Sequence, residues 1–146
     1  MMRKLFCIMF LVLLCSIPAH ANVSDAQDYL YQAASAAQEA CSYARKAYYY
    51  ASDLEEIQYY SRKAMRAAEE SESYCGLAID ELYGANMDDA IMHTEDAASY
   101  AYSAYRYSRQ AYQSSEYDDA QYYARKAMNE ASYAESSACD AASECE

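Results

Sequence analysis

Four stretches of the chain carry a small residue at almost every seventh position: Ala26, Ala33, Ala40 and Ala47; Ile57, Ala64, Ser71 and Ala78; Ala90, Ala97, Ala104 and Ala111; and Ala120, Ala127, Ala134 and Ala141. A second, mostly small set lies four residues after these: Leu30, Ala37, Ala44 and Ala51; Ser61, Ala68, Cys75 and Leu82; Ala101 and Ser108; and Ala124, Ala131 and Ala138. Positions i, i+4 and i+7 share one face of an α-helix. The pattern predicts an all-α chain with alanine-rich heptad seams and a slight left-handed supercoil.

Little in residues 22–146 would interrupt a helix, because this region has no proline and only Gly76 and Gly84 as glycines. Capping residues precede acidic or amide residues at four places, which are Ser24, Ser52, Asn86 and Ser115. Such residues accept hydrogen bonds from the free amides of a first turn. We therefore expect four long helices over residues 25–50, 53–83, 87–113 and 116–142.

The second half of this region repeats the first. Residues 58–65, with the sequence QYYSRKAM, recur at 121–128 as QYYARKAM, and Ala33-Ala34-Ser35 recurs as Ala97-Ala98-Ser99. Repetition at this scale indicates a helical hairpin used twice. We predict a single bundle domain over 22–146, built from two antiparallel hairpins at 24–85 and 86–146.

A second fold is suggested by a resemblance. Glu116-Tyr117-Asp118-Asp119-Ala120, followed by Lys126-Ala127, is similar to the second helix of a tetratricopeptide repeat, and residues 87–91 echo it. This resemblance implies a solenoid of short helix pairs that binds peptides. The spacing between the matching starts varies, and nothing divides each stretch into two helices. The solenoid is therefore the alternative to four long helices.

The first 21 residues have the pattern of a cleavable signal peptide. Arg3 and Lys4 precede an apolar run from Leu5 to Ile17, and Ala19 and Ala21 occupy the small-residue positions before a cleavage site. The run is shorter than the roughly 20 residues that span a bilayer. We expect cleavage before Asn22, export to a periplasm or outside the cell, and no membrane span afterwards.

Loss of Arg3 and Lys4 would leave nine Lys or Arg against 23 Asp or Glu, a formal charge of −14. Such a chain repels the phosphates of nucleic acids. The composition therefore argues against a nucleic-acid partner and is typical of a soluble exported protein. The Arg-Lys pairs at 45–46, 62–63 and 125–126 recur at one register of the repeats, and ion pairs are the expected role for them.

Four cysteines follow the signal: Cys41, Cys75, Cys139 and Cys145. In antiparallel hairpins the height of a residue follows from its distance to the turn at 1.5 Å per residue. Cys75 and Cys139 then lie at one level, with Cys145 close by, so these three are the disulfide candidates. Cys41 lies roughly 18 Å away by the same rise, and we expect it to be free or intermolecular.

Tyrosine supplies the bulk that alanine lacks, since the chain has 19 tyrosines. Eight of them flank the seams and are expected to lie over them: Tyr29, Tyr43, Tyr50, Tyr60, Tyr74, Tyr100, Tyr107 and Tyr123. Seven more fall on outer positions: Tyr48, Tyr49, Tyr59, Tyr102, Tyr105, Tyr112 and Tyr122. Exposed aromatics often mark a protein-binding surface, so these seven are the candidate partner face, with further packing between the hairpins as the alternative.

No motif for catalysis, a cofactor or a metal ion stands out. His93 is the only histidine after residue 21, and the position three residues before it is Ala90 rather than the carboxylate of a di-iron bundle. The sequence favours an exported, non-enzymatic protein-interaction or structural module, with an unidentified protein or a second copy as partner. The alternative is a sequestration protein that binds small cationic or aromatic ligands between its hairpins.

Overall fold

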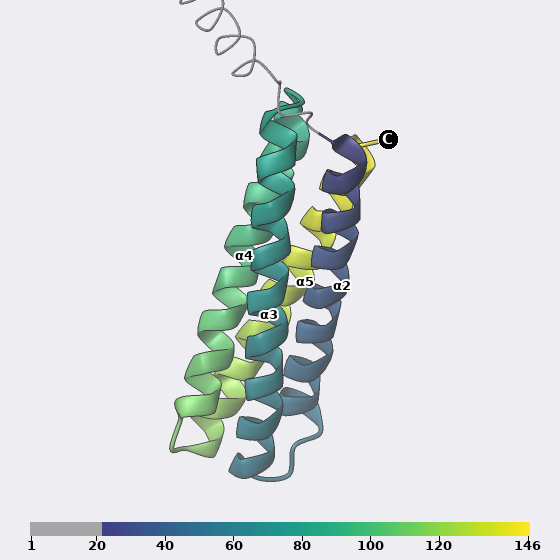
Figure 1. Cartoon of the computed structure of the whole chain (residues 1–146). Helices are drawn as coiled ribbons and strands as arrows, with labels where there is room; N and C mark the ends of the chain where they lie inside the picture. The colour runs from purple at the N-terminus through teal and green to yellow at the C-terminus, as the bar shows by residue number, and fades with distance from the viewer. Residues whose placement is uncertain (1–21) are drawn as a thin grey trace, which may run out of the picture.

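The computed structural model describes residues 22–146 and contains four long helices (Figure 1). They are α2 (Val23–Tyr49), α3 (Leu54–Tyr83), α4 (Asp88–Gln113) and α5 (Tyr117–Glu144). The four predicted helices are confirmed, with every end within two residues of its expected place. The predicted signal peptide lies outside the described residues.

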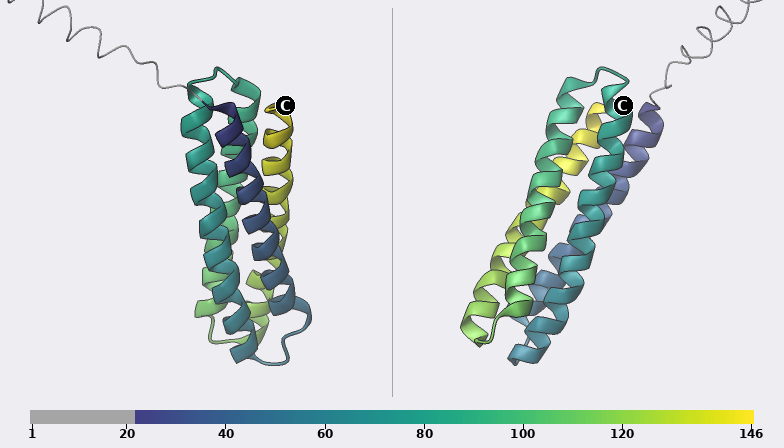
Figure 2. Two further views of the ribbon diagram at one scale, coloured as in Figure 1. Left: turned by 45° about the vertical axis from the view of Figure 1, so that its right-hand side comes forward. Right: turned by 60° about the vertical axis from the view of Figure 1, so that its left-hand side comes forward.

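The helices run up and down in turn and form a four-helix bundle (Figure 2). Helix α2 packs along α3 and α5, and α4 packs along the same two helices, while the diagonal pairs touch far less. Each hairpin is therefore joined to the other along two seams. The tetratricopeptide-like alternative is wrong, because each stretch is one unbroken helix of 26 to 30 residues instead of a short pair.

The helix starts differ slightly from the predicted caps. Ser52 is not the cap of α3; the next residue, Asp53, has the extended backbone of a cap, and its carboxylate accepts a 2.9 Å bond from the Glu56 amide. Ser52 instead donates its amide and its hydroxyl to the Glu56 carboxylate, at 2.8 and 3.1 Å. The other three caps lie one or two residues from Ser24, Asn86 and Ser115 and make no side-chain cap bond: Asn22, Met87 and Glu116.

The core consists of the two predicted sets of heptad positions. All of their members are buried, and only Ala51 is more than 2% exposed. In the middle of the bundle Ala40, Ala68, Ala104 and Ala131 form one cluster together with residues just beside them. Because these side chains end at Cβ, neighbouring backbones meet there with almost nothing between them.

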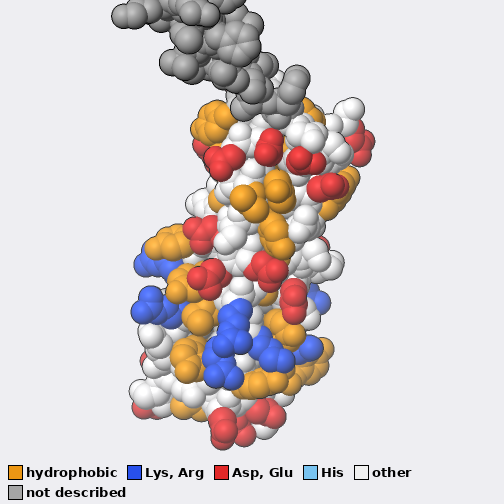
Figure 3. Space-filling view, viewed as in Figure 1, with side chains coloured by type: hydrophobic (Ala, Val, Ile, Leu, Met, Phe, Trp, Pro, Cys, Tyr) orange, Lys and Arg blue, Asp and Glu red, His pale blue; other side chains and the backbone are white. Residues whose placement is uncertain are grey.

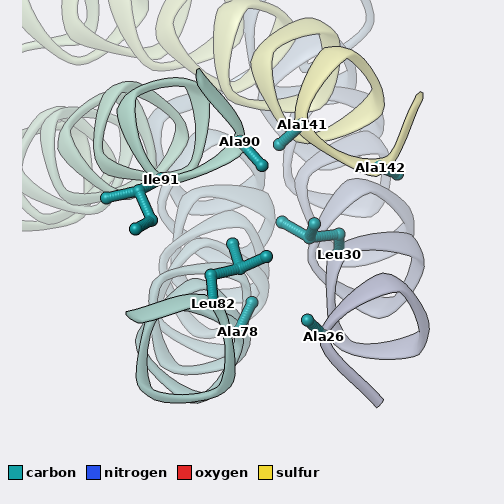
Figure 4. Packing of buried hydrophobic residues seen from close by; sticks show 8 residues of the cluster. All are labelled: Ala26, Leu30, Ala78, Leu82, Ala90, Ile91, Ala141 and Ala142. Atoms are coloured by element: carbon teal, nitrogen blue, oxygen red, sulfur yellow. The ribbon is translucent and has the colours of Figure 1, made fainter. Parts of the chain in front are cut away.

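Larger aliphatic side chains fill the core only toward its ends. Leu30 and Leu82 point into the space between the helices at the end near the C-terminus (Figure 4), and Ile57 lies in the cluster at the opposite end. Larger aliphatic side chains therefore fill the core at both ends of the bundle, and alanine fills it between them.

Four hydroxyls are buried in the same seams. Ser71 donates a 2.9 Å hydrogen bond to the carbonyl of Ala33 on the next helix, and Thr94 donates to Ala90 in its own helix. The hydroxyls of Ser61 and Ser108 have no hydrogen-bond partner among residues 22–146. The equivalent positions in the other repeat hold Ala124 and Ala44, so a methyl group also fits this site.

Candidate functional site

Charge is segregated along the axis of the bundle. All nine Lys and Arg of residues 22–146 lie in the half nearer the α2–α3 and α4–α5 loops, and we call them the basic band: Arg45, Lys46, Arg62, Lys63, Arg66, Arg106, Arg109, Arg125 and Lys126. Six of the 23 Asp and Glu lie below the band, at the helix starts by these loops, and the other 17 lie above it in the acidic half. Figure 3 shows this order on one face, with basic side chains gathered between acidic ones.

The band consists of a motif that the duplication has preserved. The ammonium of Lys63 lies 5.2 Å from the centre of the Tyr43 ring and 4.9 Å from that of Tyr59. In the second hairpin, Lys126 lies 5.1 Å from the Tyr107 ring and 5.0 Å from the Tyr122 ring. Lys63 and Lys126 therefore each meet two tyrosine rings, and Lys46 of the third Arg-Lys pair meets one, where the sequence suggested ion pairs. A ring holds a cation in place without neutralising its charge.

The tyrosines also affect proton binding in the band. A hydrogen bond with Lys63 lowers the pKa of the Tyr59 phenol, and the same bond raises the pKa of Lys63. A hydrogen bond with Tyr122 raises the pKa of Lys126 in the same way. These lysines therefore keep their positive charge at every physiological pH.

The seven tyrosines of the predicted partner face all lie in or beside the basic band. Five are exposed, namely Tyr49, Tyr59, Tyr102, Tyr112 and Tyr122, whereas Tyr48 and Tyr105 are half-buried. They come from all four helices, so they ring the bundle instead of forming one face. The guanidinium of Arg106 lies 5.9 Å from the centre of the Tyr102 ring, which joins this tyrosine to the band.

Six of the eight seam-flanking tyrosines are half-buried, as expected of rings that lie over a seam. The other two, Tyr50 and Tyr100, are exposed. Tyr50 departs most, because it is the C-cap residue of α2 and so follows the last residue of the helix. Together with Tyr49, Arg45 and Met128 it lines an open depression of about 430 Å³. This depression lies between α2 and α5 beside the basic band.

The four cysteines are free thiols in the structure. Cys75 shares a core cluster with Ala138, the neighbour of Cys139, which confirms that the two cysteines lie at one height. Cys75 is buried while Cys139 is exposed, so the two thiols point to different surroundings. Pairing among Cys75, Cys139 and Cys145 stays a prediction. Cys41 is buried in a separate cluster, and burial raises the pKa of its thiol.

The remaining chemistry of the described residues is sparse. No three His, Cys, Asp or Glu side chains of residues 22–146 are grouped to hold a metal ion. His93 is half-buried on the flank of α4. None of the four helices has both the length and the apolar character to cross a bilayer.

Comparison with protein-family models, with curated proteins and with solved structures finds no match to this chain. The structure itself defines the class of protein, an up-down-up-down bundle of four long helices with alanine seams. Its most distinctive surface is the basic band with its tyrosines.

Proposed function

We propose that the mature chain is an exported, non-enzymatic protein-interaction module that binds acidic segments of a protein partner through the basic band and the tyrosines around it. The observation that carries the proposal is the gathering of all nine basic side chains at one height, among exposed tyrosines, in a chain with 23 acidic residues.

Tyrosine and arginine are the residues on which protein interfaces most often depend. A tyrosine ring adds contact area at a small cost in conformational entropy, because only two torsion angles must be fixed. The lysines held over Tyr43, Tyr59, Tyr107 and Tyr122 add positive charge in fixed positions. The band therefore offers both parts that an acidic segment needs, which are apolar contact and charge pairing.

The acidic regions on either side give this surface its selectivity. A negatively charged partner is repelled from the ends of the rod and attracted only to the band, so electrostatics restricts where it binds. The rigid alanine core supports the same function, because the band keeps its shape when a partner binds.

Capture of small ligands between the hairpins has less support. The layers between the hairpins are filled with alanine in continuous contact, as in the cluster of Ala37, Ala101 and Ala134. A cationic or aromatic ligand would have to separate these helices.

Photo-crosslinking tests the proposal. A photoreactive phenylalanine analogue replaces Tyr50 in the band, and a control variant carries it at Tyr83 in the acidic half; the two tyrosines are 74% and 61% exposed. We expect a discrete protein adduct in the exporting cell from position 50, lost when Arg45 and Arg125 are changed to Ala, and none from position 83. An adduct from position 83 alone, or one that survives loss of the arginines, would overturn the proposal.

A further inference from the structure

One outer face of the first hairpin carries like charges side by side. The ammonium groups of Lys46 and Lys63 lie 5.3 and 5.2 Å from the centre of the same Tyr43 ring, although they belong to different helices. Higher on this face, Glu39 and Glu70 line a single shallow groove. Like charges therefore gather at two levels of this face, and each level attracts the opposite charge on a partner.

The four charges have a simple spacing. Glu39 and Lys46 are seven residues apart on α2, and Lys63 and Glu70 are seven residues apart on α3. Seven residues are two helical turns, about 10.5 Å along the axis. Each helix therefore presents one negative and one positive side chain along one stripe, with the two lysines at one level and the two glutamates at another.

We propose that this first-hairpin face, made by Glu39, Lys46, Lys63 and Glu70, binds a second copy of the chain in antiparallel orientation. The inference rests on the proposed function, since it names one acidic partner of the band. A two-fold axis midway between the charges places α2 on α2 and α3 on α3 of the other copy. Lys46 and Lys63 of each copy then face Glu39 and Glu70 of the other.

A parallel arrangement would set lysine against lysine and glutamate against glutamate, so charge selects the antiparallel one. Two copies centred in this way overlap along residues 54–79 of α3 and residues 36–49 of α2, about 37 and 20 Å at 1.5 Å per residue. Two helices of about 10 Å width then give a footprint on the order of 600 Å² per copy, which is the size of a small, weakly associating interface next to the roughly 800 Å² of a standard one.

The second hairpin provides a natural comparison, because it keeps the lysine but not the rest of the pattern. Lys126 corresponds to Lys63, whereas Ser103, Gln110 and Tyr133 stand where the first hairpin has Glu39, Lys46 and Glu70. Only one face of each copy is self-complementary. The assembly therefore closes at two copies and does not extend into a filament.

Net charge sets the conditions for pairing. Each copy of residues 22–146 carries −14, so two copies repel at long range when the ionic strength is low. At about 0.15 M salt the screening length is about 8 Å, which removes most of this repulsion but leaves side chains in direct contact paired. We expect association to be strongest near physiological ionic strength and weaker both at very low salt and at about 1 M.

Charge exchange tests the proposal by sedimentation velocity of residues 22–146, at concentrations up to several hundred micromolar. We expect dimers of the unmodified chain and at least tenfold weaker association for both Glu39→Lys with Glu70→Lys and Lys46→Glu with Lys63→Glu. Mixing these two variants restores dimers, and so does combining all four changes in one chain. Ser103→Lys with Tyr133→Lys, on the second hairpin, has no effect.

An unmodified chain that stays monomeric throughout would overturn the second-copy proposal, and so would double variants that associate like the unmodified chain. The band itself is tested separately by titration with a polyglutamate peptide. If the chain stays monomeric but binds polyglutamate through the band, the dimer proposal is overturned and the proposed function stands. If the chain neither dimerises nor binds polyglutamate, both proposals are overturned.

Discussion

The hydroxyl of Ser71 on α3 donates a 2.9 Å hydrogen bond to the carbonyl oxygen of Ala33 on α2, inside the seam of the first hairpin. This bond ties two backbones that alanine has already brought close together. It also shows what the hydroxyls of Ser61 and Ser108 lack, since both are buried without a partner.

Replacing each of these serines with alanine should distinguish a buried hydroxyl that makes a hydrogen bond from one that makes none. Ser61→Ala and Ser108→Ala remove unpaired buried hydroxyls, so each should raise the free energy of unfolding by about 1 kcal/mol. Ser71→Ala loses a hydrogen bond worth about 1 kcal/mol, partly offset by the better helix propensity of alanine. Chemical denaturation of the three variants measures these changes in the free energy of unfolding. Equal effects at all three positions would contradict the hydrogen-bond assignment.

The middle of the core should not accept larger side chains. Ala104→Leu inserts three carbons into the layer of Ala40, Ala68 and Ala131, and overpacking of this kind costs about 1–3 kcal/mol. Ser99→Leu, at an exposed position of the same helix, should change stability by less than about 0.5 kcal/mol. Thermal unfolding compares the two variants. An Ala104→Leu variant as stable as the parent would mean that the layer has room to spare.

The cysteines should differ in reactivity according to burial. Burial raises the pKa of Cys75 to about 12, so its thiol should resist alkylation in the folded reduced protein, whereas the exposed Cys139 should react readily. Mass mapping after brief iodoacetamide treatment measures both sites. Labelling of Cys75 at the rate of Cys139 would contradict the packing of this cluster.

The same pKa makes stability depend on alkaline pH. The folded-state pKa of Cys75 lies above the ordinary value of 9.0, so its contribution to stability is complete below pH 9 and declines as the pH rises from 9 toward 12, because only the unfolded chain ionises there. A Cys75→Ala variant should lose less stability over this range than the parent. Denaturation at several pH values compares the two, with Cys139→Ala as the control, which should depart less from the parent because that thiol is exposed and its pKa is raised by weaker burial.

The bond between Lys63 and Tyr59 should be visible in a titration. Since Lys63 lowers the pKa of the Tyr59 phenol, Lys63→Gln should raise it toward the ordinary value of a tyrosine. Carbon NMR of the phenol ring measures this change. A change of Lys46, which lies over Tyr43, should move the pKa of Tyr59 much less, since Lys46 acts on that phenol only through its charge and makes no hydrogen bond to it. Equal effects of the two lysines would contradict the assignment.

The fold follows from the sequence because its main signal is repeated in every helix. Alanine at each seventh position, as at Ala26 and Ala97, fits a close-packed seam and few other structures, so both the helices and their buried faces were predictable. The cap residues of the helices were less predictable. Ser52 and Asp53 can both begin a helix, and in the folded chain the carboxylate of Asp53 accepts the capping bond from the Glu56 amide, while Ser52 donates to the Glu56 carboxylate.

The basic band could be predicted only in part. The repeated Arg-Lys pairs and the outer tyrosines were visible in the sequence, but Arg66, Arg106 and Arg109 lie outside those pairs. These arginines lie at the height of the Arg-Lys pairs, but this can be seen only when the helices are aligned by their alanine seams and folded back at the loops. The lysine pair at Lys46 and Lys63 was hidden for the same reason, since 17 residues separate them along the chain.

Titration of isotope-labelled residues 22–146 with a short polyglutamate peptide, followed by amide chemical shifts, tests most directly that the basic band is the binding surface. We expect saturable shifts confined to residues 42–66 and 105–128, which contain every Lys and Arg of the described chain, and weakened binding as salt increases. Shifts centred on the acidic half, or no binding at low salt, would contradict the account.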